Sequence, residues 1–394
     1  MRSVIIASPY AHRPGHHLSS ATALADALVR REIDAEIVTS LPPHGRVPAT
    51  LSDRVRSAGE LSRSLLRRAA TRTPVQQHVS FERSLEVLTC MVAAWRLSSS
   101  KTKPAFHFVD ATYLLLGLWC HLVSARTVYY TTSELSGVGP SVHLKGFARI
   151  LAWARGAVLR AACRRGRLWV VCETAFVEAR VRAVLGDHVS LVPYAITEPT
   201  LKLGREEART RLKIQDDLPI LLMFGTHREG KNYDVIFEAA KQLEFRVCLL
   251  FVGKLISGND PRKLGARWGC SGAVYVDNFV TEEAAALYFA AADACVLSYE
   301  GDYTKGSGVL LEACRYGIPI IASRTGHLAE FVELYRCGLL FEQGNATDLA
   351  EVIHRFTGLE QSEREELQTG LNKAAKDHSW TRLVEYYISM YNLT

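Results

Sequence analysis

The stretch 299–348 combines residue types that bind a phosphorylated ligand. A polar, glycine-containing loop leads into a helix that the spacing of apolar residues predicts to begin near Ser307 and to end at Gly317. Free backbone N–H groups and the positive end of the helix dipole at such a start attract an anion. Glu312 follows about one turn into the helix, and an ionised carboxylate accepts hydrogen bonds from a diol. Phosphate and diol together indicate a nucleotide.

The same stretch fits one strand–helix–strand unit. Residues 293–298 form a short apolar run typical of a buried parallel strand, and residues 318–322 form the next one. Any strand–helix–strand unit with a glycine loop would have this pattern, so the pattern alone does not identify the ligand.

Four segments in order then resemble the donor-binding half of GT-B glycosyltransferases, most closely glycosyltransferase family 4. The first segment, Gly-Val-Leu-Leu-Glu-Ala-x-x-x-Gly-Ile-Pro-Ile-Ile-Ala-Ser, starts at Gly308. The second, Gly-x-x-x-Glu, ends at Glu330. Gly338 begins Gly-Leu-Leu-Phe, and Asn345 begins Asn-Ala-Thr-Asp-Leu-Ala. The resemblance implies transfer of a sugar, with retention, from a UDP-, GDP- or other nucleoside-diphosphate sugar. It implies no further cofactor and no metal.

The resemblance also assigns roles to individual residues. Lys231 and Arg228 are predicted to hold the leaving diphosphate, and Glu312 to bind the ribose hydroxyls; we predict these three as the catalytic set. Glu330 is expected to orient the loop beside the diphosphate or the sugar. The predicted donor-binding residues are Gly15, Gly225, Glu300, Thr304, Ser307, Gly308, Val309 and Glu330.

Three positions depart from the family pattern. Thr226 stands where relatives have an arginine, so Arg228 is the candidate substitute. Thr304 stands at the first of two family glutamates, with Glu300 as the candidate replacement, and Thr132 stands where many relatives have a histidine. These departures keep a second interpretation open, a non-catalytic GT-B protein that binds or scaffolds another transferase. An epimerase or phosphorylase on the same fold is a third, although the sequence shows no signature of a Schiff-base lysine.

The chain opens as a second Rossmann-like unit. Its first loop contains Gly15, which the resemblance places near the donor diphosphate. The predicted acceptor- or sugar-side residues are His16, His17, Thr132 and Glu134. The two histidines are candidates for proton transfer, and ordinary solvated loop histidines are the alternative.

The predicted fold is α/β, with two Rossmann-like domains that face each other across a cleft. Residues 1–196 form the acceptor domain, residues 205–376 the donor domain, and residues 377–394 a terminal helix that returns to the first domain. Apolar spacing predicts strands at 3–8, 34–39, 105–109, 126–131, 168–172, 189–192, 218–224, 245–252 and 273–276. It predicts helices at 19–31, 51–72, 81–97, 112–124, 142–167, 174–185, 205–212, 231–243, 281–291, 349–356 and 360–376.

Charge is unevenly distributed along the 394 residues. Residues 1–200 hold 25 Lys and Arg against 14 Asp and Glu, a net of +11, whereas the remainder has −5. An acidic partner is therefore expected: an acceptor glycan or glycolipid that bears phosphate, or an anionic membrane surface. Two predicted basic amphipathic helices, 51–72 and 142–167, fit a membrane surface; a solvated arginine face is the alternative. No nucleic acid is expected, because no nucleic-acid-binding motif is present.

The nine cysteines are scattered and form no Cys-x-x-Cys pair. We predict them to be small core residues in a reducing compartment, with no zinc site. The apolar runs are too short to span a bilayer, and the first residues predict a strand rather than a secretory leader. We therefore expect a cytoplasmic protein, or one peripheral to the cytoplasmic face of a membrane.

Overall fold

The structure, a computed structural model, divides into two compact units. Unit 1 comprises Met1–Ala195 and Trp380–Thr394, and unit 2 comprises Ile196–Ser379. For residues 17, 75–82 and 147 only the backbone is described. The described residues are 2–11, 17–43, 47–58, 75–98, 104–109, 111–123, 125–131, 135, 138, 145–199, 201, 203–214, 218–258, 260–270, 272–301, 303–304 and 306–392.

Unit 1 is built on a parallel sheet. Its strands are β1 (Ser3–Ala7), β2 (Asp34–Thr39), β3 (Val55–Ser57), β4 (Ala105–Phe108), β5 (Thr127–Thr131), β6 (Leu168–Cys172) and β7 (Val189–Leu191). They lie in the order β3-β2-β1-β4-β5-β6-β7, and every pair is parallel. The predicted strands at 34–39 and 168–172 are confirmed to the residue.

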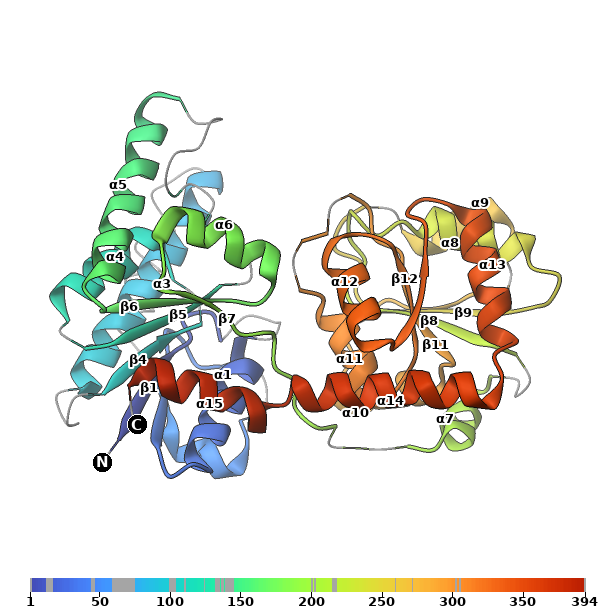
Figure 1. The fold of residues 1–394 in the computed structure, drawn as a ribbon, viewed down its shortest axis with the longest axis horizontal. Helices are drawn as coiled ribbons and strands as arrows, with labels where there is room; N and C mark the ends of the chain where they lie inside the picture. Colours follow the sequence, from blue (N-terminus) through green and yellow to red (C-terminus); the bar gives the residue numbers. More distant parts are fainter. Residues whose placement is uncertain are drawn as a thin grey trace. The chain divides into compact units, whose positions relative to one another are not determined.

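Helices cover both faces of this sheet (Figure 1). Ile5 and Ala7 of β1 pack toward α3 (Val75–Ser98), α4 (Tyr113–Leu122), α5 (Gly146–Arg164) and α6 (Ala175–Leu185). Val4 and Ile6 pack toward α1 (His17–Val29) and α15 (Trp380–Tyr391). Successive side chains of a strand point to opposite faces, so a fully apolar strand fills two cores.

The terminal helix α15 belongs to unit 1 and packs against α1. Its Tyr391 hydroxyl lies 2.8 Å from Nδ1 of the buried His107 of β4, and Arg126 donates to the carbonyl of Met390 at 3.1 Å. Burial lowers the pKa of His107 to about 3, so this imidazole is neutral at ordinary pH.

The predicted basic helix 51–72 is wrong over its first residues. Ala49–Arg54 forms a 3-10 helix (η1) and β3 follows, paired with β2. Arg54 forms an ion pair with Asp34 at 2.7 Å, and Arg56 with Glu36 at 3.7 Å. Pairing along the sheet edge has overridden the helical spacing of the apolar residues. Residues 59–72 of that prediction lie outside the described residues.

Unit 2 is built on a second parallel sheet. Its strands are β8 (Ile220–Phe224), β9 (Cys248–Val252), β10 (Val274–Val276), β11 (Ala294–Leu297), β12 (Ile320–Ser323) and β13 (Gly338–Phe341). They lie in the order β10-β9-β8-β11-β12-β13. The helices are α7 (Arg205–Leu212), α8 (Tyr233–Gln242), α9 (Pro261–Trp268), α10 (Glu282–Ala291), α11 (Gly308–Tyr316), α12 (Gly326–Tyr335), α13 (Ala346–Thr357) and α14 (Gln361–Asp377).

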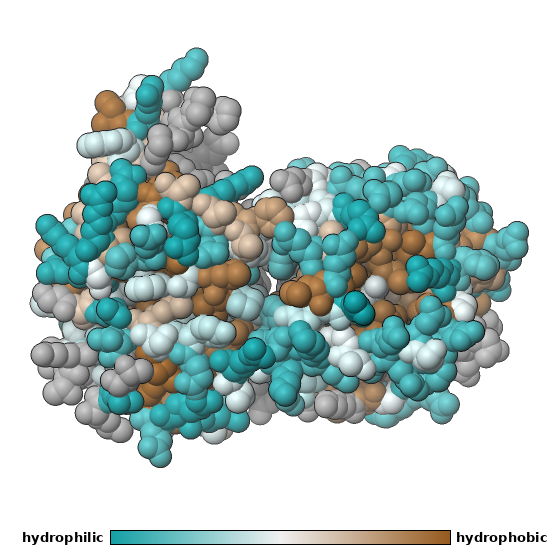
Figure 2. All heavy atoms as spheres, in the orientation of Figure 1, coloured by the Kyte–Doolittle hydropathy of each residue, from teal (hydrophilic) through white to brown (hydrophobic). Residues whose placement is uncertain are grey.

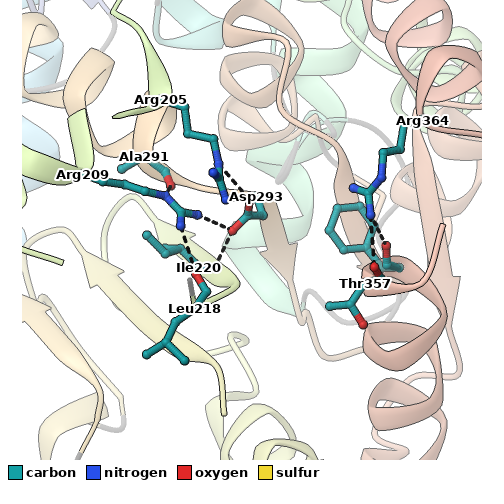
Figure 3. Close-up of polar contacts among 9 residues, drawn as sticks. Arg205, Arg209, Leu218, Ile220, Ala291, Asp293, Thr357 and Arg364 are labelled. Atoms are coloured by element: carbon teal, nitrogen blue, oxygen red, sulfur yellow. Dashed lines mark hydrogen bonds and ion pairs between the residues drawn. The ribbon is translucent and has the colours of Figure 1, made fainter. Parts of the chain in front are cut away.

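A buried ionic cluster fixes α7 to the amino ends of β8 and β11 (Figure 3). Arg209, only 1% exposed, donates to Asp293 at 2.5 Å and to the carbonyls of Ala291 and Leu218. Asp293 also accepts from the backbone N–H of Ile220 at 2.7 Å and from the more exposed Arg205.

The same figure also draws Arg364, which donates to the last carbonyls of α13 and so caps that helix.

The chain enters and leaves unit 2 at adjacent points. Ile196 and Ser379 form a parallel bridge, and the Ile196 N–H donates to the carbonyl of His378 at 2.9 Å.

Candidate functional site

The order of strands in unit 2 marks one place on the sheet. Connections run outward in one direction through β9 and β10 and in the other through β12 and β13, so the direction reverses between β8 and β11. In open parallel sheets, ligands bind at this reversal, beyond the carboxyl ends of the strands. The two loops that leave these ends are residues 225–232 and 298–307. They contain most of the predicted donor-site residues of unit 2.

Backbone hydrogen bonds fasten the two loops together. Lys231 and Tyr299 form an antiparallel bridge. The Asn232 N–H donates to the carbonyl of Ser298 at 2.8 Å, and the Glu300 N–H donates to the carbonyl of Gly230 at 2.8 Å. The loops therefore form one supported rim at the end of the sheet.

The loop 298–307 leads directly into α11, so that the start of this helix lies at the rim. Ser307 is the cap, since its Oγ accepts from the Leu310 N–H at 3.3 Å, and it also lies 3.2 Å from the buried Tyr299 hydroxyl. The predicted start is confirmed, and Gly317 ends the helix in the left-handed region at φ 71°. The N–H groups of Gly308 and Val309 belong to the first turn, which has no acceptors within the helix. A Cβ on Gly308 would meet nothing within 4 Å, so this turn is open to a ligand.

Gly225 brings the two loops to close quarters. Its φ of 83° is a backbone conformation that is strained for any residue other than glycine. A Cβ built there would lie 3.0 Å from Val309 Cγ2 and 3.8 Å from Lys231 Nζ. Gly225, Lys231 and the first turn of α11 are thus neighbours in space, as an anion site requires.

Lys231 supplies a partly desolvated cation. The side chain is half-buried, and Nζ donates to the carbonyl of Phe224 at 2.9 Å. Burial, followed by the positive charge of Arg228, lowers the pKa of Lys231 from 10.5 to about 7. A bound anion would stabilise the charged form of this desolvated ammonium group. Arg228 itself is exposed.

His227 supports the loop 225–232, a role that no sequence pattern indicated. It is buried, with Nδ1 2.6 Å from the hydroxyl of Tyr233. Burial, followed by the charge of Lys231, lowers the pKa of His227 to about 4. The imidazole is therefore a neutral packing and hydrogen-bonding group.

Glu312 lies one turn into α11 and is half-buried. Its Oε2 accepts from Arg315 at 3.3 Å. Burial raises the pKa of Glu312, and the charge of Arg315 opposes that rise. Arg315 was not predicted. Its buried guanidinium also contacts Glu282 and donates to the carbonyl of Glu198 at 3.0 Å.

Three other predicted donor-side residues differ in their exposure to solvent. Glu300 and Glu330 are exposed, and Thr304 is buried at 9% exposure. The loop around them is fixed by Gln343, whose Nε2 donates to the carbonyls of Tyr299 and Gly301. Substitution of Glu300 for the first family glutamate stays a prediction.

The predicted site residues of unit 1 are Gly15, on the donor side, and the four acceptor- or sugar-side residues. Gly15, His16, Thr132 and Glu134 lie outside the described residues. His17 begins α1, and its side chain is not among those described. Within the described part of the chain, no group of three or more His, Cys, Asp and Glu has the arrangement of a metal site.

Comparison with known proteins points to one family. The profile of the family "Glycosyl transferases group 1" matches residues 204–378, which is nearly all of unit 2. The protein named D-inositol 3-phosphate glycosyltransferase from Nocardiopsis dassonvillei is 27% identical over 219 residues, covering 52% of this chain and 50% of that protein. The MMP alpha-(1->4)-mannosyltransferase of Mycolicibacterium hassiacum is 31% identical over 216 residues, covering 53% and 49%. The chain thus matches about half the length of these curated relatives.

A solved structure of similar fold extends the likeness to both units. The Anabaena protein Alr3699/HepE in complex with UDP matches with a TM-score of 0.70 at 14% sequence identity, covering 100% of each chain. The same protein is also known with UDP-glucose. At this identity the match reports the fold, which agrees with the two parallel sheets described above. The chain therefore shares the two-domain fold of the Anabaena protein, and residues 204–378 match the profile of the glycosyl transferases group 1.

Proposed function

We propose that this protein transfers a sugar from a nucleoside-diphosphate sugar to an acceptor, and that unit 2 binds the donor. The observation that carries the proposal is the meeting of Gly225, Lys231 and the open first turn of α11 at the reversal of strand order. Backbone N–H groups and a desolvated ammonium at one point are suited to a diphosphate.

Charge balance explains why this site would promote the reaction. Breaking the bond between the anomeric carbon and the diphosphate oxygen leaves the electron pair on the diphosphate. The acceptor oxygen bonds to the anomeric carbon, and the departing diphosphate takes up the proton that the acceptor hydroxyl loses. Lys231, Arg228 and the N–H groups of Ser307 and Gly308 would stabilise the growing negative charge. Retention of configuration is our expectation from the family resemblance.

Glu312 would bind the ribose hydroxyls. Two hydroxyl donors need an ionised carboxylate, and Arg315 opposes the effect of burial on its pKa. Arg315 is thus a positioning residue, held in turn by Glu282 and the Glu198 carbonyl.

The relatives indicate which substrates to test first. The UDP and UDP-glucose complexes of the Anabaena protein support a UDP-sugar as the first donor to test. The name of the Nocardiopsis relative, which contains inositol 3-phosphate, supports a phosphate-bearing acceptor, and a glycolipid remains the other candidate. We place the acceptor on unit 1 and the reaction in the cytoplasm, where free cysteines such as the buried Cys90 and Cys295 stay reduced.

The test is release of nucleoside diphosphate from a panel of donor sugars, with and without a crude acceptor extract. Lys231→Ala and Glu312→Ala should abolish release. Lys376→Ala, an exposed lysine, and Glu333→Ala, an exposed glutamate paired with Arg324, should leave it unchanged.

Release that survives both site variants would refute the site. Donor binding without turnover on any acceptor would instead favour the scaffold interpretation, which the threonines at 226 and 304 keep in view.

A further inference from the structure

Unit 1 carries an apolar surface that the donor site does not use. Of the thirteen large apolar side chains exposed among the described residues, seven lie on three neighbouring helices of one layer. We call this surface the α3–α5 face; it comprises Leu88 and Trp95 on α3, Leu114, Leu118 and Leu122 on α4, and Ile150 and Trp153 on α5.

The leucines of α4 form one stripe at a spacing of four residues. Exposure increases along it, from Leu114 through Leu118 to Leu122, which is 83% exposed. The helix, YLLLGLWCHL, contains no Asp, Glu, Lys or Arg. Contiguous apolar surface of this kind on a folded protein marks a place where something binds.

The outer side of α5 adds arginines to this surface. Positions 149, 150, 153 and 164 fall within one helical stripe, so the exposed Arg149 and Arg164 flank Ile150 and Trp153, which is 61% exposed. Figure 2 shows hydrophobic and hydrophilic side chains side by side along α5.

The described side chains of α3, α4 and α5 carry no exposed negative charge. Among them the one carboxylate is Glu86, which is buried at 4% exposure. The exposed charges among these described side chains are therefore positive, and they include Arg83 and Arg96 of α3.

Packing holds the three helices in place beneath the surface. A Cβ on Gly117 of α4 would lie 2.6 Å from Val158 Cγ1 of α5, so glycine permits a close approach of the two helices. Arg165 lies 2.9 Å from Nδ1 of His121, and Arg167 donates to the His121 carbonyl at 3.2 Å. The exposed side chains thus project from a fixed layer.

We propose that the α3–α5 face docks on an anionic lipid surface. Leucine and tryptophan side chains would enter the headgroup region, and the arginines would meet lipid phosphates. Nucleic acid would leave the leucines in water. A second copy of the chain would set the same arginines against each other across a two-fold interface, which charge repulsion opposes. The lipid surface alone satisfies both the apolar and the cationic side chains.

The proposal is independent of the donor site, because it involves a different unit and different residues. Among the described residues, no helix is long and apolar enough to cross a bilayer, and docking of this kind needs none.

Flotation of the full chain with vesicles tests the proposal. Binding is expected to phosphatidylcholine vesicles that contain phosphatidylglycerol, to be far weaker on phosphatidylcholine alone, and to fall as NaCl rises to about 0.5 M. Arg149→Glu combined with Arg164→Glu should raise the lipid concentration for half binding by about tenfold or more. The double variant Leu118→Asp, Leu122→Asp should weaken binding at least as much.

Matched controls lie in unit 2. Leu334, 69% exposed on α12, provides Leu334→Asp, and the exposed Arg246 and Arg355 provide a double charge reversal to Glu. Both controls should bind vesicles as the unaltered chain does. Far-ultraviolet circular dichroism checks that each variant is folded.

Equal binding to neutral and anionic vesicles, or no binding to either, would overturn the proposal. Loss of binding in the unit 2 controls would do the same. A dimer in light scattering that the leucine variants dissolve would assign the face to a second copy of the chain instead.

Discussion

Replacing Lys231 by methionine should stabilise the empty protein while weakening its hold on a nucleotide. The substitution keeps most of the side-chain volume and removes the charge. Burial has lowered the pKa of this lysine from 10.5 to about 7. Holding it charged in the folded protein therefore costs free energy that a neutral side chain does not.

The size of the effect follows from that pKa. Each pKa unit corresponds to about 1.36 kcal/mol, so the shift from 10.5 to about 7 means that the charged form of Lys231 is destabilised by about 5 kcal/mol in the folded protein. The side chain is half-buried and donates to the Phe224 carbonyl, an interaction that methionine loses. Screening and the lost hydrogen bond reduce the expected gain to about 2 kcal/mol below pH 7.

The gain should depend on pH in a defined direction. Between pH 7 and pH 10.5 the unfolded chain binds more protons at this lysine than the folded chain does, so the stability of the unaltered protein rises with pH across that window. Methionine does not titrate. The advantage of Lys231→Met should be complete below pH 7 and disappear near pH 10.5.

Hydrogen exchange of the amides of β8 and β11, read by mass spectrometry over a urea series, measures this local stability. The variant and the unaltered chain are compared at pH 6.5 and again at pH 9.5. Calorimetric titration with a nucleoside diphosphate should show affinity lower by about tenfold or more, because a charged hydrogen bond is lost. Lys376→Met, at an exposed lysine, is the control and should change neither quantity.

A Lys231→Met protein that is less stable than the unaltered chain at pH 6.5 would refute this reasoning. So would a stability difference that stays constant between the two pH values. Either result would mean that the lysine is well solvated, and the anion site would lose its strongest physical argument.

Three further predictions concern unit 2. Arg209→Met should cost about 3–5 kcal/mol in urea unfolding, because it removes a buried ion pair with Asp293 and leaves the carbonyls of Ala291 and Leu218 without this donor, whereas Arg205→Met at the exposed partner should cost about 1 kcal/mol or less. Gly225→Ala and Gly230→Ala both strain a positive φ, but only the first places a methyl beside Val309 and Lys231; nucleotide affinity measured by calorimetry should fall for the first alone. Arg315→Met should raise the pKa of Glu312, so that affinity is lost at a higher pH on acidification; an unchanged acid limb of the pH profile would contradict this.

The parallel sheets and the start of α11 were predictable because local signals and packing agree there. A short apolar run bounded by turn residues is typical of a strand buried on both faces, and Ser307 and Gly317 are of the residue types that cap a helix at its two ends. Helix α9 also had such signals in Asp260, Pro261 and Gly269, but its eight residues were assigned no element.

The failures have a different physical origin. The apolar spacing after Leu51 suits a helix, but pairing with β2 fixed those residues at the sheet edge. The contacts of Arg315 with Glu198 and Glu282 join segments more than 30 positions apart in the sequence. The desolvation of Lys231 likewise comes from neighbours that only the fold assembles, so its pKa is not encoded in any local pattern.

The bridge between Ile196 and Ser379 has a consequence for how such chains can be recombined. Because the two crossing points lie side by side, residues 196–379 behave as a cassette inserted at one position of a continuous first unit. If unit 2 binds the donor as proposed, exchanging that cassette for one from a relative with another donor would change the donor while leaving every strand and helix of the host unit in its own order.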